Sequence, residues 1–155
     1  MQAREGVVER LNNHLTVELT AINQYFLAAE MCRNWGFERL YEKFRGLSVE
    51  EMKDAEQLVA HILFLEGIPN MQRLNEVPVG EDVPEILQAG LSLERGAVDA
   101  LTEAISHCQQ VGDYKTRGMF EEMIAEESEH VDWFETQFET IERVGLERYL
   151  AQQIH

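Results

Sequence analysis

Two pairs of side chains that can bind a metal recur at the same spacing in this 155-residue sequence. Glu51 and Asp54 lie three residues apart, and so do Glu127 and His130. Because residues at i and i+3 project from one face of a helix, each pair can present two ligand groups to one point. Either pair alone is weak support for a site, since helices contain many glutamates and histidines by chance.

A single glutamate precedes each pair by the same distance. Glu18 lies 33 residues before Glu51, and Glu94 lies 33 residues before Glu127. One glutamate from each of two helices, with a ligand pair from each of two others, is the arrangement that holds a carboxylate-bridged pair of metals in a helix bundle. Oxygen ligands with one imidazole suit iron or manganese better than structural zinc. We therefore predict a two-metal centre, and a coincidental polar layer is the alternative.

Each of these side chains falls on an apolar stripe whose steps of three and four residues mark the inward face of a helix. The stripes run from Val8 to Ala29, Leu40 to Ile62, Leu87 to Ile105 and Phe120 to Ile141. No stripe position is a lysine or an arginine. Buried carboxylates are costly when unpaired, so divalent cations are the expected partners. Other acids, including Glu126, are predicted to lie on solvated faces.

Helical periodicity covers four long stretches, and no stretch alternates as a strand does. The expected helices are 5–34, 37–66, 82–112 and 113–145, followed by a short amphipathic tail at 146–154. Asp82 and Asp113 are predicted to cap the third and fourth helices. The segment 67–81, which contains Pro69 and Pro78, can run the length of the bundle. The predicted fold is all-α: a ferritin-like four-helix bundle with one long crossover and a short C-terminal fifth helix.

An internal repeat relates the two halves of the chain. A shift of 76 positions places Glu18 on Glu94 and Glu51 on Glu127. Such a repeat predicts a bundle with pseudo-two-fold symmetry, in one domain that spans residues 1–155.

The composition is strongly acidic, with 29 Asp and Glu against 13 Lys and Arg and a net charge of −16. Such a surface repels nucleic acid and anionic membranes, so neither is an expected partner, and it attracts cations. Cys32 and Cys108 lie far apart and in no CxxC pair, which favours reduced thiols over a disulfide or zinc framework. The first residues lack the apolar core of a signal peptide, so a cytoplasmic location is expected.

Five stretches resemble bacterioferritins, and the resemblance extends over essentially the whole chain. They are ELTAINQYF at 18–26, EMK at 51–53, ILFLEGIPN at 62–70, HVDW at 130–133 and GLERYL at 145–150. The resemblance implies a hollow shell of 24 subunits that oxidises Fe(II) with O2 or H2O2 and stores an Fe(III) mineral. It also implies an electron-donor ferredoxin as a partner.

The resemblance assigns the iron-oxidising, or ferroxidase, site to Glu18, Glu51, Glu94, Glu127 and His130, with Glu51 and Glu127 as bridges. Where the family has a second histidine, this chain has Asp54. We expect Asp54 still to bind iron, because its carboxylate oxygen is as many bonds from the backbone as a histidine Nδ1. The changed ligand leaves an alternative open: a haem-bearing subunit with a weakened site that co-assembles with a second, intact bacterioferritin subunit. A di-iron oxygenase is less favoured, because nothing indicates a pocket for an organic substrate.

The resemblance further implies that Met52 ligates haem b, paired with Met52 of a two-fold-related subunit. Met52 is one residue, or about 100°, from Glu51 on a helix, so its side chain should leave the bundle and face a neighbour. Filling of a subunit interface is the alternative. The family can carry a histidine for an additional iron where this chain has Gly46, so that site is not expected here, although Glu50 remains available.

Tyr25 and Trp133 flank the predicted site in the sequence. Either both pack in an aromatic core, or they supply electrons for the reduction of the oxidant, in which case Tyr25 has a catalytic role.

Overall fold

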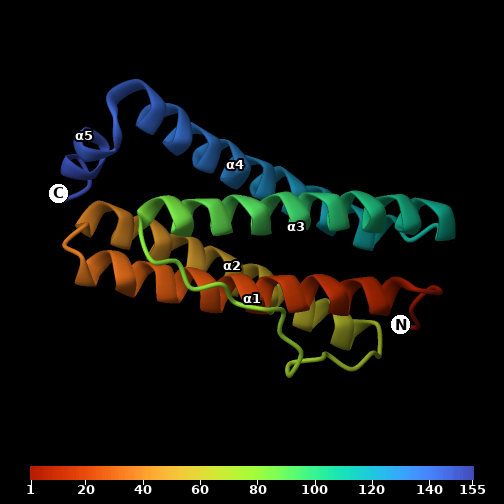
Figure 1. Ribbon diagram of the computed structural model, residues 1–155. Helices are drawn as coiled ribbons and strands as arrows, with labels where there is room; N and C mark the ends of the chain where they lie inside the picture. The colour runs from red at the N-terminus through yellow and green to blue at the C-terminus, as the bar shows by residue number, and fades with distance from the viewer.

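The computed structural model describes residues 1–155 and contains five helices and no strands. The helices are α1 (Val7–Asn34), α2 (Glu38–Phe64), α3 (Val83–Val111), α4 (Tyr114–Val144) and α5 (Leu146–Ala151). The first four form a bundle, and the short α5 lies at one end of it (Figure 1). The predicted all-α bundle with a short fifth helix is confirmed. None of the helices combines the length and the apolar character that crossing a membrane requires.

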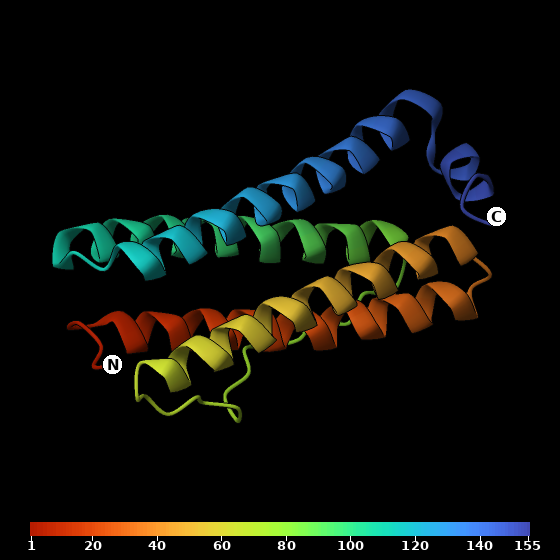
Figure 2. The same ribbon diagram turned by 180° about the vertical axis from the view of Figure 1, so that it is seen from behind.

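The long helices form two antiparallel hairpins, α1 with α2 and α3 with α4, as both ribbon views show (Figures 1 and 2). The segment between α2 and α3 runs back along α1, so that α3 starts at the opposite end of the bundle (Figure 1). Its backbone N–H groups at Asn70 and Asn75 donate to Asn12 Oδ1 at 2.8 Å and to Thr20 Oγ1 at 2.9 Å. These bonds fix the predicted long crossover to α1.

The helix ends follow local backbone chemistry. Asp82 accepts a hydrogen bond from the N–H of Glu85 at 3.0 Å, and Asp113 accepts one from the N–H of Thr116 at 2.9 Å, so both predicted caps are confirmed. Three ends differ from prediction by more than one residue. α1 starts after Gly6, whose φ is 75°, α2 stops at Phe64 before Glu66 takes a φ of 62°, and α5 ends at Ala151.

Helix starts follow the internal repeat. α1 and α3 begin at Val7 and Val83, and α2 and α4 begin at Glu38 and Tyr114, a separation of 76 residues in each case. The starts of the helices in the two hairpins are therefore related by the same shift as the predicted ligands.

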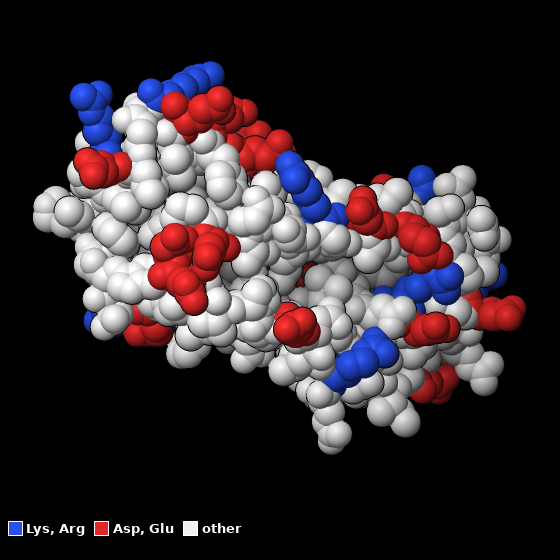
Figure 3. Space-filling view, viewed as in Figure 1, with Lys and Arg blue, Asp and Glu red and all other residues white.

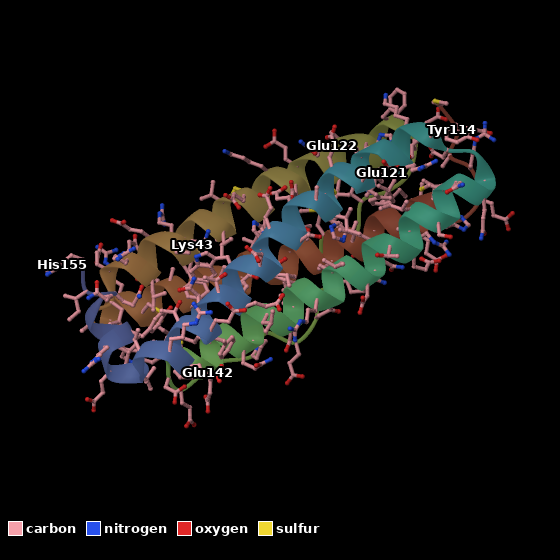
Figure 4. All side chains as sticks on the ribbon, turned by 90° about the horizontal axis from the view of Figure 1, so that it is seen from above. Lys43, Tyr114, Glu121, Glu122, Glu142 and His155 are labelled. Carbon is pink, nitrogen blue, oxygen red and sulfur yellow. The ribbon has the colours of Figure 1, made fainter.

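The apolar core is divided into two clusters by a polar layer at mid-height. One cluster includes Tyr25, Phe44 and Phe134, and the other includes Leu58 and Phe120. Seen from above, α4 runs from Tyr114 past Glu121 and Glu122 to Glu142, and side chains lie in the space between the helices (Figure 4). The polar layer is thus sealed by apolar side chains from both ends of the bundle.

The fifth helix closes the end of the bundle where α2 begins. The hydroxyl of Tyr149, which is buried, donates to Gln137 Oε1 at 2.8 Å, and the N–H of Arg39 donates to the carbonyl of Gln153 at 2.9 Å. The tail is therefore held to both α4 and α2.

Gly90 on α3 leaves space for the ring of Phe134 on α4, and two alanine variants test this close contact. An added Cβ at Gly90 would lie 2.3 Å from Phe134 Cζ, whereas at Gly96 on the same helix it would meet nothing within 4 Å. We expect Gly90→Ala to cost about 1–3 kcal/mol through overpacking. Gly96→Ala should stabilise the helix by up to about 1 kcal/mol. Thermal unfolding followed by circular dichroism compares them, and equal midpoints would contradict the close approach.

Candidate metal centre

The structure brings together, in one buried layer, all six side chains that the sequence predicted as metal ligands. Each long helix supplies at least one of them at mid-length. They are Glu18 on α1, Glu51 and Asp54 on α2, Glu94 on α3, and Glu127 and His130 on α4. Glu18, Glu94 and Glu127 are 0% exposed. The helical seams that bury the apolar side chains therefore bury these groups as well.

The ligand atoms form two overlapping groups, and within each group all the atoms lie within 4.8 Å of one another. The two groups are Glu51, Glu94, Glu127 and His130, and Glu18, Glu51, Asp54 and Glu127. Glu51 and Glu127 belong to both groups. Two ligand groups that share two carboxylates have the form of a bridged two-metal centre.

Ten buried side-chain nitrogen and oxygen atoms have no hydrogen-bond partner, and every one of them belongs to this layer. Their residues are the six predicted ligands and His14. Four of the five carboxylates lie within 3.5 Å of a histidine nitrogen, and no lysine or arginine forms an ion pair with any of the five. Since buried polar atoms are almost always paired, this cluster lacks the cations that would satisfy it. The residues therefore fit a pair of divalent metal ions.

His130 is the imidazole at the centre of one group. Its Nδ1 lies 3.3 Å from Glu51 Oε1, 3.4 Å from Glu94 Oε1 and 3.5 Å from Glu127 Oε2, while its Nε2 lies 2.9 Å from Glu50 Oε2. Burial alone would lower the pKa of His130, but hydrogen bonds with these carboxylates outweigh burial and raise it. The inner nitrogen faces the ligand group, and the outer one is held by Glu50, as is usual for a metal-binding histidine.

Burial is the largest influence on the pKa values of the carboxylates in this layer. It raises the pKa of Glu18, Glu51 and Glu127 well above the ordinary value. For Glu94 burial acts in the same direction, but hydrogen bonds with Glu127 and His130 outweigh it and lower the pKa. The layer without metal therefore holds protons, which a metal ion must displace.

Asp54 joins this layer with a neighbour that the sequence analysis misplaced. Burial raises the pKa of Asp54 to about 7, and the charge of Glu126 adds to the effect. Glu126 is half-buried beside Asp54, so its predicted place on a solvated face was wrong. It also groups with Glu50 and His130 at the edge of the layer.

His14 is the one member of the layer that sequence reasoning missed. It lies four residues before Glu18 on α1, is 3% exposed, and brings Nε2 within 2.8 Å of Glu18 Oε1. Burial lowers the pKa of His14 to about 4, so its imidazole is neutral. The sequence feature that could have identified His14 is its position four residues before a predicted ligand glutamate. It was missed because the predicted inward stripe passes through Leu11 and Leu15 and does not include position 14.

The two aromatic residues differ in their relation to the site. The hydroxyl of Tyr25, which is fully buried, donates to Glu94 Oε1 at 2.5 Å. Trp133 is separated from Tyr25 by the ring of Phe134, with ring centroids 5.0 and 6.1 Å apart, and Lys43 Nζ lies 5.0 Å from its ring centroid. Tyr25 thus contacts a predicted ligand directly, whereas Trp133 is partly buried and packs against the outside of the apolar cluster.

Residues 8–144 match the ferritin family, described as a ferritin-like domain. A bacterioferritin of Mycolicibacterium paratuberculosis is 43% identical over 98% of this chain and 96% of its own length. Bacterioferritins of Brucella melitensis and Streptomyces coelicolor are 40% and 42% identical, over 96% and 99% of this chain and 92% of their own lengths. The chain belongs to the bacterioferritin family. Membership of this family supports iron storage as its function.

As its position one residue from Glu51 on the helix predicted, the side chain of Met52 leaves the bundle. Its side chain is 55% exposed on α2, and Phe26 and Val49 are exposed on the adjoining parts of α1 and α2, which a hydrogen bond from Ser48 Oγ to the carbonyl of Ile22 holds together. A thioether among exposed apolar side chains fits a haem or a subunit contact. A Cβ added at Gly46 would meet no other part of the fold within 4 Å, so the space beside this position is open.

Acidic side chains are exposed across the face of this bacterioferritin chain that Figure 3 shows. On the face drawn in Figure 3, acidic side chains are scattered between stretches of uncharged surface. With a net charge of −16, this surface attracts cations over a broad area, which favours the arrival of metal ions.

Proton release on metal binding tests the state of Asp54. The pKa of Asp54 is raised to about 7 from an ordinary 3.8, so Asp54 stays protonated below pH 7 in the folded, metal-free protein. The unfolded chain loses this proton near pH 3.8, so the stability of the metal-free fold decreases as pH rises from 3.8 to about 7. Asp54→Asn should therefore release about one proton fewer per subunit than wild type on Zn(II) binding at about pH 6, and nearly the same number at about pH 8. Calorimetry in buffers of different ionisation enthalpy measures the release.

The control for this titration is Glu56→Gln, an exposed acid on the same helix, which should release as many protons as wild type. No deficit in Asp54→Asn at pH 6 would show that Asp54 is already ionised before metal binds and would contradict the raised pKa.

Proposed function

We propose that this chain oxidises Fe(II) at the carboxylate layer and stores the product as an Fe(III) mineral inside a closed shell, with residues 1–155 acting as one ferritin-like domain. The observation that carries the proposal is the pair of four-residue groups that share Glu51 and Glu127. All the unpaired buried side-chain nitrogens and oxygens of the chain gather around those two residues. Fe(II) is the substrate here, and it enters a cluster that already lacks cations.

The residues of the layer have different roles in the proposed reaction. Glu51 and Glu127 hold two Fe(II) ions together as bridges, so that both can react with one oxidant. Each Fe(II) gives up one electron. H2O2 takes two electrons and two protons to yield two water molecules, and O2 takes two of each to yield H2O2. When only one Fe(II) ion is bound, Tyr25 would supply the second electron, losing its phenolic proton with that electron and becoming a tyrosyl radical. Its hydrogen bond to Glu94 supports this role.

A matched pair of variants on α4 tests the proposal. Glu127→Gln removes the charge of a shared carboxylate, while Glu129→Gln removes an exposed charge two residues away. Changes to groups that merely support metal ligands cost about 10–100-fold, so we expect Glu127→Gln to oxidise Fe(II) at least about tenfold more slowly than wild type. Glu129→Gln should match wild type. Stopped-flow absorbance of the purified homopolymer, at two Fe(II) per subunit, measures the rates.

Equal rates in the three proteins would refute oxidation at this layer. A slow wild-type homopolymer that becomes fast on co-assembly with a second bacterioferritin subunit would instead favour the alternative function, a haem-bearing subunit with a weakened site. The observation behind that alternative is Asp54, which stands where the family has a histidine.

We also propose that the shell has 24 subunits and binds haem b between two copies of the chain, through Met52 of each. The exposed thioether and the apolar side chains around it support this assignment. Haem supplies one-electron transfer, and an electron-donor ferredoxin would reduce stored iron for release. A cytoplasmic location is supported by Cys32 and Cys108, which are buried free thiols.

Substitution of Met52 tests the haem assignment. Met52→Leu keeps an apolar side chain of similar volume but removes the sulfur, so it should abolish haem binding while Fe(II) oxidation and the size of the shell remain unchanged. The haem absorbance per subunit and sedimentation velocity measure the two effects. Met71→Leu, a second exposed methionine, is the control. Wild-type haem content in Met52→Leu would rule out Met52 as the ligand.

A further inference from the structure

The two halves of the metal layer are related by the 76-residue repeat, but they are not the same. His130 on α4 corresponds to Asp54 on α2, so the repeat gives an imidazole to the half with Glu94 and a carboxylate to the half with Glu18. Position 14 differs in the opposite sense. His14 on α1 corresponds to Gly90 on α3, where the ring of Phe134 occupies the space of a side chain. The half without the repeated imidazole therefore carries one from a different helix.

His14 is aimed at that half of the layer. It lies one helical turn before Glu18, so both side chains leave the same face of α1. Its Nε2 is 2.8 Å from Glu18 Oε1, and one atom each of His14, Glu18 and Glu127 lie within 4.8 Å of one another. The ring is 3% exposed and packs edge-on against Phe120, with ring centroids 6.3 Å apart. Packing thus holds the imidazole toward the carboxylates.

The hydrogen bonding of His14 is unlike that of an ordinary buried histidine. Neither of its ring nitrogens has a hydrogen-bond partner, and its close contact with Glu18 lacks hydrogen-bond geometry. His61, which is also buried, shows the usual arrangement, with Nε2 2.8 Å from Thr116 Oγ1. Because a buried polar group without a partner is destabilising, His14 needs a partner that the polypeptide does not supply.

We propose that His14 is a ligand of the two-metal centre, binding with Glu18 and Asp54 the ion on that side of the shared glutamates. The inference rests on the proposed two-metal function. It gives each ion one imidazole, from His14 on one side and from His130 on the other. The histidine that this chain lacks at position 54 is thereby replaced from α1 rather than lost.

Exchange of the two side chains tests this assignment. His14→Leu removes the imidazole, and the double variant His14→Leu with Asp54→His moves it to the position that the repeat predicts. His14→Gln is a polar replacement in case the leucine variant fails to assemble. His107→Gln removes a partly exposed imidazole remote from the layer and is the control. The probe is Co(II), whose visible absorption reports its ligands, titrated into metal-free shells and also soaked into crystals for anomalous diffraction.

We expect wild type and His107→Gln to bind two Co(II) per subunit in the layer. His14→Leu and His14→Gln should keep the ion beside His130 and bind the other at least about tenfold more weakly. The double variant should regain the second ion. Unchanged affinity and spectrum in His14→Leu and His14→Gln would overturn the proposal. If wild type itself fails to bind two ions, the two-metal function fails, and this outcome is distinct from a failure of His14 alone.

Thermal unfolding separates a ligand from a structural histidine. If His14 stabilised the bundle through an ion pair with Glu18, His14→Leu would lower the midpoint of the metal-free shell. As a ligand, it should leave that midpoint unchanged or raise it, because an unpaired buried polar group is replaced by an apolar one. The increase in midpoint on adding Co(II) should instead be smaller than in wild type. A lower metal-free midpoint with a full Co(II) response would overturn the proposal.

Discussion

Five carboxylates buried at mid-height without a lysine or arginine beside them are the constraint on which the rest of the structure depends. Apolar clusters above and below keep water away, so only protons or cations can balance the charge. Helices of 27 to 31 residues are long enough to place such a cluster on each side of the layer. In the metal-free protein, this burial raises the pKa values of Glu18, Glu51 and Glu127.

Pseudo-symmetry explains both what the two halves share and where they differ. The repeat carries Glu18 onto Glu94 and Glu51 onto Glu127, which yields two terminal and two shared carboxylates. It does not carry an imidazole to both sides, since Asp54 stands at the position equivalent to His130. In this member of the bacterioferritin family, His14 supplies the imidazole for the side that has Asp54. The two ions would thus have similar donor types supplied by different helices.

Periodicity and repeat spacing predicted the fold because burial of an apolar stripe leaves a regular mark in a sequence. The ends of α1 and α2 were less predictable, since they depend on single left-handed residues, Gly6 and Glu66. The six predicted ligands were identifiable because a charged group on an apolar stripe stands out. His14 did not stand out, because a buried face is wider than one stripe. Glu126 lies at the edge of the layer, where a neighbouring helix determines exposure.

The central claim is that Glu51 and Glu127 bridge two metal ions. Anomalous diffraction at the iron edge, from crystals soaked with Fe(II) without oxygen, tests it most directly. We expect two iron peaks in each subunit, both adjacent to Glu51 and Glu127, with His130 beside one ion and His14 beside the other. An empty layer in crystals that bind iron elsewhere, or one ion contacting neither shared glutamate, would contradict it.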